Sequence, residues 1–262
     1  MEHVSWSGCR PKPSGAKVHE LGGRVSVRPL TEGSSVVVID DDVNDAASLI
    51  PTLQDAGFRA EMITQFTLGQ DADAFLASRG NRYDAVVCDH ILAGRGNVRF
   101  TGAELVCKAN RRAGTPLPAV LISSHVNTEQ NGAILRWREG IPSVVDKTDA
   151  SDEVVEALQY TMDELAGNLA RERRAFATPI EVLEVQPGGE EPKAKVVVVG
   201  WKIDSSVWMP LRPIEEATGL RPEELRGQWL EAEVNCYAKD ASDLFYRNII
   251  LAPDLPQEWL SA

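Results

Sequence analysis

The chain has 262 residues, of which 43% are hydrophobic and 25% charged, and its formal net charge at pH 7 is −12. This composition is typical of a globular protein, and the length allows one domain of ordinary size and a smaller one. An acidic chain is a poor nucleic-acid binder, because phosphate contacts need clustered Lys and Arg, and no apolar run approaches the roughly 18 residues of a membrane span.

Residues 1–34 are rich in Gly, Ser and Pro, which predicts a flexible N-terminal arm. Strand-like runs then alternate with helical patterns, which predicts a doubly wound parallel sheet with helices on both faces. The five predicted strands are residues 36–39, 58–64, 83–88, 118–122 and 143–145. The predicted helices are residues 43–56, 71–79, 103–112 and 129–139, with a fifth starting near Ser151. Pro51 in the first helix predicts a kink or a later start.

The fifth helix carries one apolar stripe at three- and four-residue spacing, whose first half would pack on the sheet. The stripe consists of Val154, Leu158, Met162, Leu165 and Leu169. Because it continues past Gly167 towards Phe176, we expect a longer helix that leaves the domain. Residues 168–177 would then be a helical linker, able to act as a stalk or to form a homodimer.

Residues 178–262 have a different pattern, which predicts a small antiparallel β-rich domain resembling a barrel or sandwich. Its predicted strands are residues 180–185, 194–203, 206–209, 228–238 and 244–251, with short helical turns within 213–226. Four tryptophans are interpreted as core residues, with an aromatic binding surface as the alternative: Trp201, Trp208, Trp229 and Trp259. Eight basic and fifteen acidic side chains give this part a net charge of −7, so we expect it to bind protein and not DNA.

No enzymatic site is predicted in the second domain, because the sequence has no histidine after His125. The four cysteines show no paired spacing, which predicts reduced thiols in a cytoplasmic protein. They are Cys9, Cys88, Cys107 and Cys236. The N-terminus also lacks the apolar core of a secretory signal.

Polar side chains close four of the five predicted parallel strands. Asp40 and Asp41 follow the first strand, Asp89 the third, Ser123 the fourth and Lys147 the fifth. The carboxyl ends of such strands meet at one edge of the sheet, so we expect one shared pocket. Carboxylate oxygens suit Mg²⁺, and a hydroxyl and an ammonium beside them suit phosphoryl transfer to an aspartate.

The alternative interpretation is plainer. Acids after strands are often helix N-caps, and a lysine after a strand is usually a solvated loop charge. Each position alone favours that alternative, whereas their agreement at successive strand ends favours a functional pocket.

On these residues, positions 35–167 resemble a receiver domain of bacterial two-component response regulators. The resemblance implies that Asp89 is the phosphoacceptor, and that Ser123 and Lys147 contact the phosphoryl oxygens. It also implies a Mg²⁺ site formed by Asp40, Asp41, Asp89 and the backbone carbonyl of Ile91. A histidine kinase or phosphotransfer protein would donate the phosphoryl group, and a protein bound by the C-terminal domain would receive the signal. A phosphate sink or shuttle and a pseudo-receiver scaffold remain alternatives.

Three positions depart from the receiver pattern. Thr148 replaces the usual proline after Lys147, which makes a cis bond costly, about 2.5–4 kcal/mol. Val144 stands at the aromatic switch position, so a signal would need another element.

The third departure is a long loop after Asp89 that carries Arg95 and Arg99, interpreted as a mobile surface loop or as a lid over the phosphate. Ile91 and His125 stand where receivers control the approach of water. An apolar Ile91 cannot orient a water molecule, so we expect the phosphoryl state to decay slowly.

Overall fold

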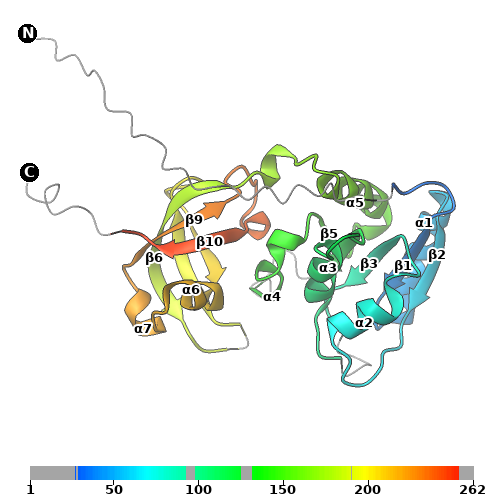
Figure 1. The fold of residues 1–262 in the computed structure, drawn as a ribbon, viewed down its shortest axis with the longest axis horizontal. Coiled ribbons are helices and arrows are strands. Elements are labelled where there is room, and N and C mark those ends of the chain that lie inside the picture. Colours follow the sequence, from blue (N-terminus) through cyan, green and yellow to red (C-terminus); the bar gives the residue numbers. More distant parts are fainter. Residues whose placement is uncertain (1–26, 28, 93–97, 125–131, 190, 254–262) are drawn as a thin grey trace, which may run out of the picture.

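The structure is a computed structural model that describes residues 27, 29–92, 98–124, 132–189 and 191–253. It contains two five-stranded sheets, each in its own half of the molecule (Figure 1). Within the described ranges, no helix has both the length and the hydropathy of a membrane span.

The first sheet is parallel throughout, with the strand order β2-β1-β3-β4-β5. Its strands are β1 (Ser35–Ile39), β2 (Arg59–Ile63), β3 (Ala85–Asp89), β4 (Ala119–Ser123) and β5 (Val144–Asp146). Its helices are α1 (Val43–Asp55), α2 (Ala72–Arg79), α3 (Gly102–Asn110), α4 (Gly132–Leu135) and α5 (Ala150–Leu165). The predicted doubly wound sheet is therefore confirmed.

Helices cover both faces of this sheet because alternate strand residues point to opposite sides. Val36 and Val38 of β1 pack in one apolar core with residues of α1 and α5. Val37 and Ile39 pack in a second core with residues of α2 and α3. The central strands β3 and β4 are buried along their whole length, as expected for parallel strands between two helical layers.

Helix α1 begins at Val43, because the side chain of Asp42 accepts hydrogen bonds from the backbone N–H groups of Asn44 and Asp45. The later start suggested by Pro51 is wrong, since Pro51 lies inside the helix. The described end of the N-terminal arm is attached to the domain: Leu30 packs against the core under α1 and α5. The rest of the predicted arm, residues 1–26 and 28, lies outside the described residues.

Helix α4 is shorter than the predicted helix 129–139. Helix α4 ends at Leu135, and the chain continues through a turn into the 3-10 helix η2 (Arg138–Gly140). Residues 129–131 of the predicted helix lie outside the described residues.

The long helix predicted to continue past Gly167 is wrong. Helix α5 ends at Leu165, and Gly167 adopts a φ of 95° that stops it. The linker 168–177 is not a continuous helix: it holds the 3-10 helix η3 (Arg171–Arg173), and a strand starts at Phe176. Arg173 folds this linker back onto α5, because its Nε donates to Glu164 Oε2 at 2.8 Å.

The second sheet is antiparallel, with the order β10-β9-β6-β7-β8, which confirms the predicted β-rich domain. Its strands are β6 (Phe176–Gln186), β7 (Lys193–Val198), β8 (Ser206–Pro210), β9 (Trp229–Val234) and β10 (Tyr246–Leu251). Strands β7 and β9 are shorter than the predicted 194–203 and 228–238. The helices α6 (Leu211–Thr218) and α7 (Pro222–Leu225) occupy the predicted helical segment, and α6 packs against both β10 and β7.

None of the described tryptophans is among the buried core residues of the second domain. Its buried residues are mainly aliphatic side chains on the inner face of the sheet. Trp201 packs at the edge of this core and donates from Nε1 to the backbone oxygen of Ala238 at 2.7 Å. The core prediction is wrong for Trp229, whose side chain is 45% exposed. Alternate residues of β9 face opposite sides of the sheet, and Trp229 is on the side that faces away from the core. Trp259 lies outside the described residues.

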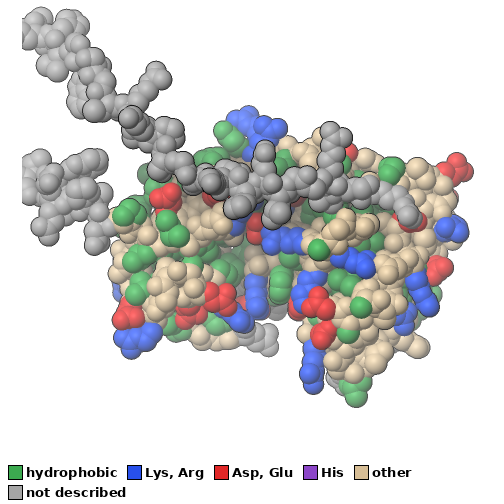
Figure 2. Space-filling view, in the orientation of Figure 1, with side chains coloured by type: hydrophobic (Ala, Val, Ile, Leu, Met, Phe, Trp, Pro, Cys, Tyr) green, Lys and Arg blue, Asp and Glu red, His purple; other side chains and the backbone are tan. Residues whose placement is uncertain are grey.

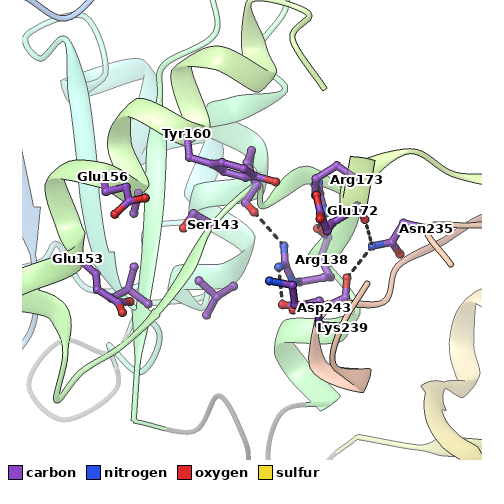
Figure 3. A pocket seen from close by; sticks show the side chains of 14 residues that line it. Arg138, Ser143, Glu153, Glu156, Tyr160, Glu172, Arg173, Asn235, Lys239 and Asp243 are labelled. Carbon is purple, nitrogen blue, oxygen red and sulfur yellow. Dashed lines mark hydrogen bonds and ion pairs between the residues drawn. The ribbon is translucent and has the colours of Figure 1, made fainter. Parts of the chain in front are cut away.

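The two domains meet along α4, η2 and α5 of the first domain. The buried Arg138 of η2 donates from Nη2 to Oδ1 of Asp243, which ends the 3-10 helix η4 (Ala241–Asp243), at 2.9 Å. The amide of Asn235 donates to the backbone oxygen of Glu172 in the linker at 2.9 Å and, within the second domain, to that of Asp243 at 3.0 Å (Figure 3).

A cavity of 510 Å³ lies beside these contacts, lined by residues of both domains. In the space-filling view the molecule is hollowed between its halves, and charged side chains of both signs border the hollow (Figure 2).

Candidate functional site

The ends of β1 and β3 bring three predicted site residues together. Ile39 pairs with Cys88, so the residues that follow them, Asp40 and Asp89, are neighbours at the same edge of the sheet. Carboxylate oxygens of Asp40, Asp41 and Asp89 all lie within 4.8 Å of one another. The three carboxylates that the sequence predicts to share a pocket are thus close together.

Lys147 reaches the same cluster from the end of β5. Its Nζ lies 3.1 Å from Oδ2 of Asp40 and 3.1 Å from Oδ1 of Asp89. The backbone N–H of Lys147 donates to the backbone oxygen of Ser123 at 3.2 Å, which ties the ends of β4 and β5 together. Ser123 itself is 1% exposed and ends β4, the strand between β3 and β5. All five residues thus gather at one edge of the sheet.

Sequence reasoning missed a further carboxylate. Oδ2 of Asp45 lies 2.7 Å from Nζ of Lys147, the shortest of the three contacts that this ammonium makes. Asp45 lies in the first turn of α1, three residues after the Asp42 cap. A signal was present, since the first predicted helix starts directly after the predicted acidic strand end and carries this acid in its first turn.

Backbone groups orient the carboxylates. The N–H of Asp42 donates to Oδ1 of Asp40 at 2.8 Å, and the N–H of Ile91 donates to Oδ2 of Asp89 at 2.9 Å. The start of α3 is packed directly against the backbone of Asp89: a Cβ on Gly102 would lie 1.8 Å from the backbone oxygen of Asp89. Only glycine fits at that position.

Burial dominates the electrostatics of the two central carboxylates. It raises the pKa of Asp89 to about 6; nearby Asp40 adds to this effect, whereas Lys147 opposes it. Burial also raises the pKa of Asp40, against hydrogen bonds from Asp42 and Lys147. Burial alone would lower the pKa of Lys147, but Asp45, Asp89 and Asp40 outweigh it and raise the value above that of a free lysine. Among the described residues, the carboxylates of Asp40, Asp41, Asp45 and Asp89 outnumber the ammonium of Lys147, so the pocket carries an excess of negative charge.

The donor set fits a hard divalent cation. Three carboxylates in mutual reach, all offering oxygen, match the ligands that Mg²⁺ takes in proteins. The carboxyl groups are crowded and partly buried, so a cation would relieve their repulsion. The backbone carbonyl of Ile91 as a further ligand stays a prediction.

The departures from the receiver pattern have clear positions in the fold. Thr148 donates from its backbone N–H and its hydroxyl to Oδ1 of Asp146, at 2.9 and 2.8 Å, and no cis peptide bond occurs within the described parts of the chain. Val144 lines the cavity between the domains. The exposed Arg99 lies beside Gly69, and its backbone N–H donates to Gln70 O at 3.0 Å. Arg95 and His125 lie outside the described residues.

The strand order β2-β1-β3-β4-β5 is that of the flavodoxin-like doubly wound sheet, which binds its ligand at the switch point between β1 and β3. Here that point holds Asp40 and Asp89. This is the flavodoxin-like fold, which receiver domains have. Receiver domains are among the similar solved structures.

Three of these structures illustrate the likeness. The response regulator receiver domain protein from Clostridium thermocellum is 15% identical over 50% of this chain and 95% of its own, with a TM-score of 0.38. The CheY-like receiver domain protein from Methanospirillum hungatei is 19% identical over 52% of this chain and 99% of its own, also at 0.38. NtrX from Brucella abortus, in complex with ATP, is 24% identical over 51% of this chain but only 28% of its own, at 0.39.

No protein-family model matches the chain, and no curated protein matches it. The likeness to receivers is therefore carried by the fold and by the residues at its strand ends.

Proposed function

We propose that the chain is a response-regulator-like signalling protein whose receiver domain is phosphorylated on Asp89. One observation carries the proposal: Lys147 Nζ lies 3.1 Å from Asp89 Oδ1, inside a cluster that includes Asp40 and Asp41. A nucleophilic carboxylate, a cation for the developing phosphoryl charge and a metal-type carboxylate set are the parts that phosphoryl transfer to an aspartate requires.

The reaction follows from these positions. An oxygen of the Asp89 carboxylate attacks the phosphorus of a phosphohistidine, the O–P bond forms, and the N–P bond breaks as the imidazole of the donor leaves. Lys147 stabilises the negative charge on the phosphoryl oxygens, and Ser123 at the end of β4 offers a hydroxyl to one of them. Mg²⁺ bound to Asp40, Asp41 and Asp89 would supply further charge neutralisation.

The donor would be a histidine kinase or a phosphotransfer protein, in line with the receiver fold. The C-terminal domain would bind a protein partner, because its net charge of −7 disfavours a phosphate backbone. Its docking on the receiver favours a dedicated output over a phosphate sink: Val144 and Val145 of β5 line the cavity shared with Lys239 and Asp243. Lys147 follows β5 directly, so a movement of this lysine can shift β5 and the contacts between the two domains.

The test is phosphorylation of the full chain with acetyl phosphate and Mg²⁺, read as mass gain on the intact protein. One phosphoryl group is expected on the wild type and none on Asp89→Asn. Asp84→Asn serves as a control, because Asp84 precedes β3 and is far along the strand from the pocket. Equal labelling of wild type and Asp89→Asn would refute the assignment, and an unlabelled wild type would favour a pseudo-receiver scaffold.

A further inference from the structure

Asp45 is the carboxylate in the pocket that neither the metal set nor the nucleophile accounts for. Its Oδ2 lies 2.7 Å from Nζ of Lys147, while Asp40 and Asp89 each lie 3.1 Å away. A lysine ammonium has three N–H donors, and these three carboxylates are enough to engage all of them. A phosphoryl oxygen that binds Lys147 must therefore share or displace one existing partner.

Asp45 is the partner that can be displaced at least cost. The Asp40 and Asp89 side chains are 6% and 9% exposed, whereas that of Asp45 is 49% exposed. A carboxylate released at the surface regains its hydration, but a buried one does not. Asp45 also lies on the first turn of α1, outside the group of carboxylates that could hold a cation.

We propose that Asp45 is a positioning residue that competes with the phosphoryl group for Lys147 and so weakens the phosphorylated state. This inference rests on the proposed function of Asp89. Two effects act in the same direction. The ion pair draws Lys147 towards α1, and the charge of Asp45 repels a phosphoryl dianion bound to the same ammonium.

The opposite effect is expected for the metal. In the unphosphorylated pocket, the charge of Lys147 repels a cation bound by the three clustered carboxylates. Asp45 offsets part of that positive charge. Removal of Asp45 therefore weakens Mg²⁺ binding while it strengthens binding of a phosphoryl group. A general loss of pocket structure would weaken both, so the opposite signs distinguish competition from damage.

The experiment uses the full chain and beryllofluoride, formed from beryllium and fluoride salts, as a phosphoryl analogue at saturating Mg²⁺. Calorimetry gives its dissociation constant for wild type, Asp45→Asn and Asp45→Glu. Asp45→Asn should bind about two- to fivefold more tightly, the range expected for loss of one partly exposed ion pair. Asp45→Glu, which keeps the charge, should stay near the wild type. Magnesium titration without beryllofluoride should give a weaker affinity for Asp45→Asn.

Asp55→Asn is the matched control, since Asp55 ends the same helix α1. It lies about 15 Å along the helix from Asp45, beyond the Debye length of about 10 Å at 0.1 M salt. Unchanged or weaker beryllofluoride binding by Asp45→Asn, or an equal gain in Asp55→Asn, would overturn the inference while the proposed function stands. A wild type that binds no beryllofluoride would overturn both.

Discussion

The Nζ atom of Lys147 lies 3.1 Å from Oδ1 of Asp89, so the proposed phosphoacceptor is already paired with a cation before a phosphoryl group arrives. The pairing is not enough to offset burial, because the pKa of Asp89 is still raised to about 6. Asp40 faces the same ammonium at 3.1 Å. Repulsion between the buried carboxylates therefore persists in the pocket, and either a divalent cation or a proton relieves it.

Asp89→Asn should stabilise the metal-free protein at pH 7.5 by about 3 kcal/mol, from the pKa difference of Asp89 and its conversion to free energy. The pKa of Asp89 is about 6 in the folded state against an ordinary 3.8, so the folded state binds the proton more tightly. The free-energy cost of the ionised Asp89 in the folded state is therefore absent below about pH 4 and complete above about pH 6. Urea unfolding with chelator at pH 7.5 and 4.5 measures it; an equal difference at both pH values would contradict the explanation.

Mg²⁺ should raise the melting temperature of the wild type, because it binds the folded pocket and not the unfolded chain. Asp41→Ala should lose most of this shift, since Asp41 contributes one of the three clustered carboxylates. Asp152→Ala removes a carboxylate from the first turn of α5, outside the cluster, and should keep the shift. Thermal unfolding with and without Mg²⁺ is the measurement, and a shift retained by Asp41→Ala would show that the ion binds elsewhere.

Much of the site was predictable because its residues lie at the ends of strands that the apolar runs of the sequence reveal. The apolar runs before Asp40 and Asp89 fixed two parallel strands, and the sheet topology then brought those residues together. Asp45 was not predicted, because its contact with Lys147 depends on the angle at which α1 leaves the sheet. The length of α5 was also missed. Its apolar stripe continues through Gly167, but the backbone turns there and Arg173 binds back to Glu164.

Gly102→Ala should disrupt the pocket. The added Cβ would lie 1.8 Å from the backbone oxygen of Asp89, so α3 or the end of β3 must move. We expect a loss of about 1–3 kcal/mol of stability, as for other overpacked sites, and slower phosphorylation by acetyl phosphate. Gly188→Ala is the control, because a Cβ there meets nothing within 4 Å. Denaturant unfolding and labelling rates test this, and wild-type values for Gly102→Ala would refute the packing argument.

Asp243→Ala should loosen the docking of the two domains. It removes the carboxylate bound to Nη2 of Arg138, a guanidinium that is buried and would keep its charge without this partner. The expected cost is about 2 kcal/mol, below that of a fully buried pair because Asp243 is partly exposed. Faster proteolysis in residues 168–177 is the readout. Asp240→Ala, just before η4, is the control, and equal proteolysis of both variants would argue against the contact.

The last prediction concerns the lifetime of the phosphoryl group on Asp89. Its hydrolysis needs a water molecule in line with the phosphorus, oriented by a polar side chain near the pocket. Ile91 follows Asp89 by two residues, and its backbone N–H binds Oδ2 of Asp89 at 2.9 Å. Its side chain is 46% exposed, so it lies at the solvent side of the nucleophile rather than in the core.

An isoleucine at this place covers the approach with apolar surface and offers no hydrogen bond to water. Wild-type phosphoprotein should therefore decay slowly. Ile91→Asn should lose its label roughly tenfold faster, which is less than the roughly 10²–10⁴-fold of a general acid or base, because an amide only orients the water. Ile91→Val is the control, because it keeps the apolar surface and the β-branch. Loss of label from purified phosphoprotein, followed by intact mass, gives both rates. A wild type that decays within seconds, with Ile91→Asn no faster, would show that Ile91 does not limit the access of water.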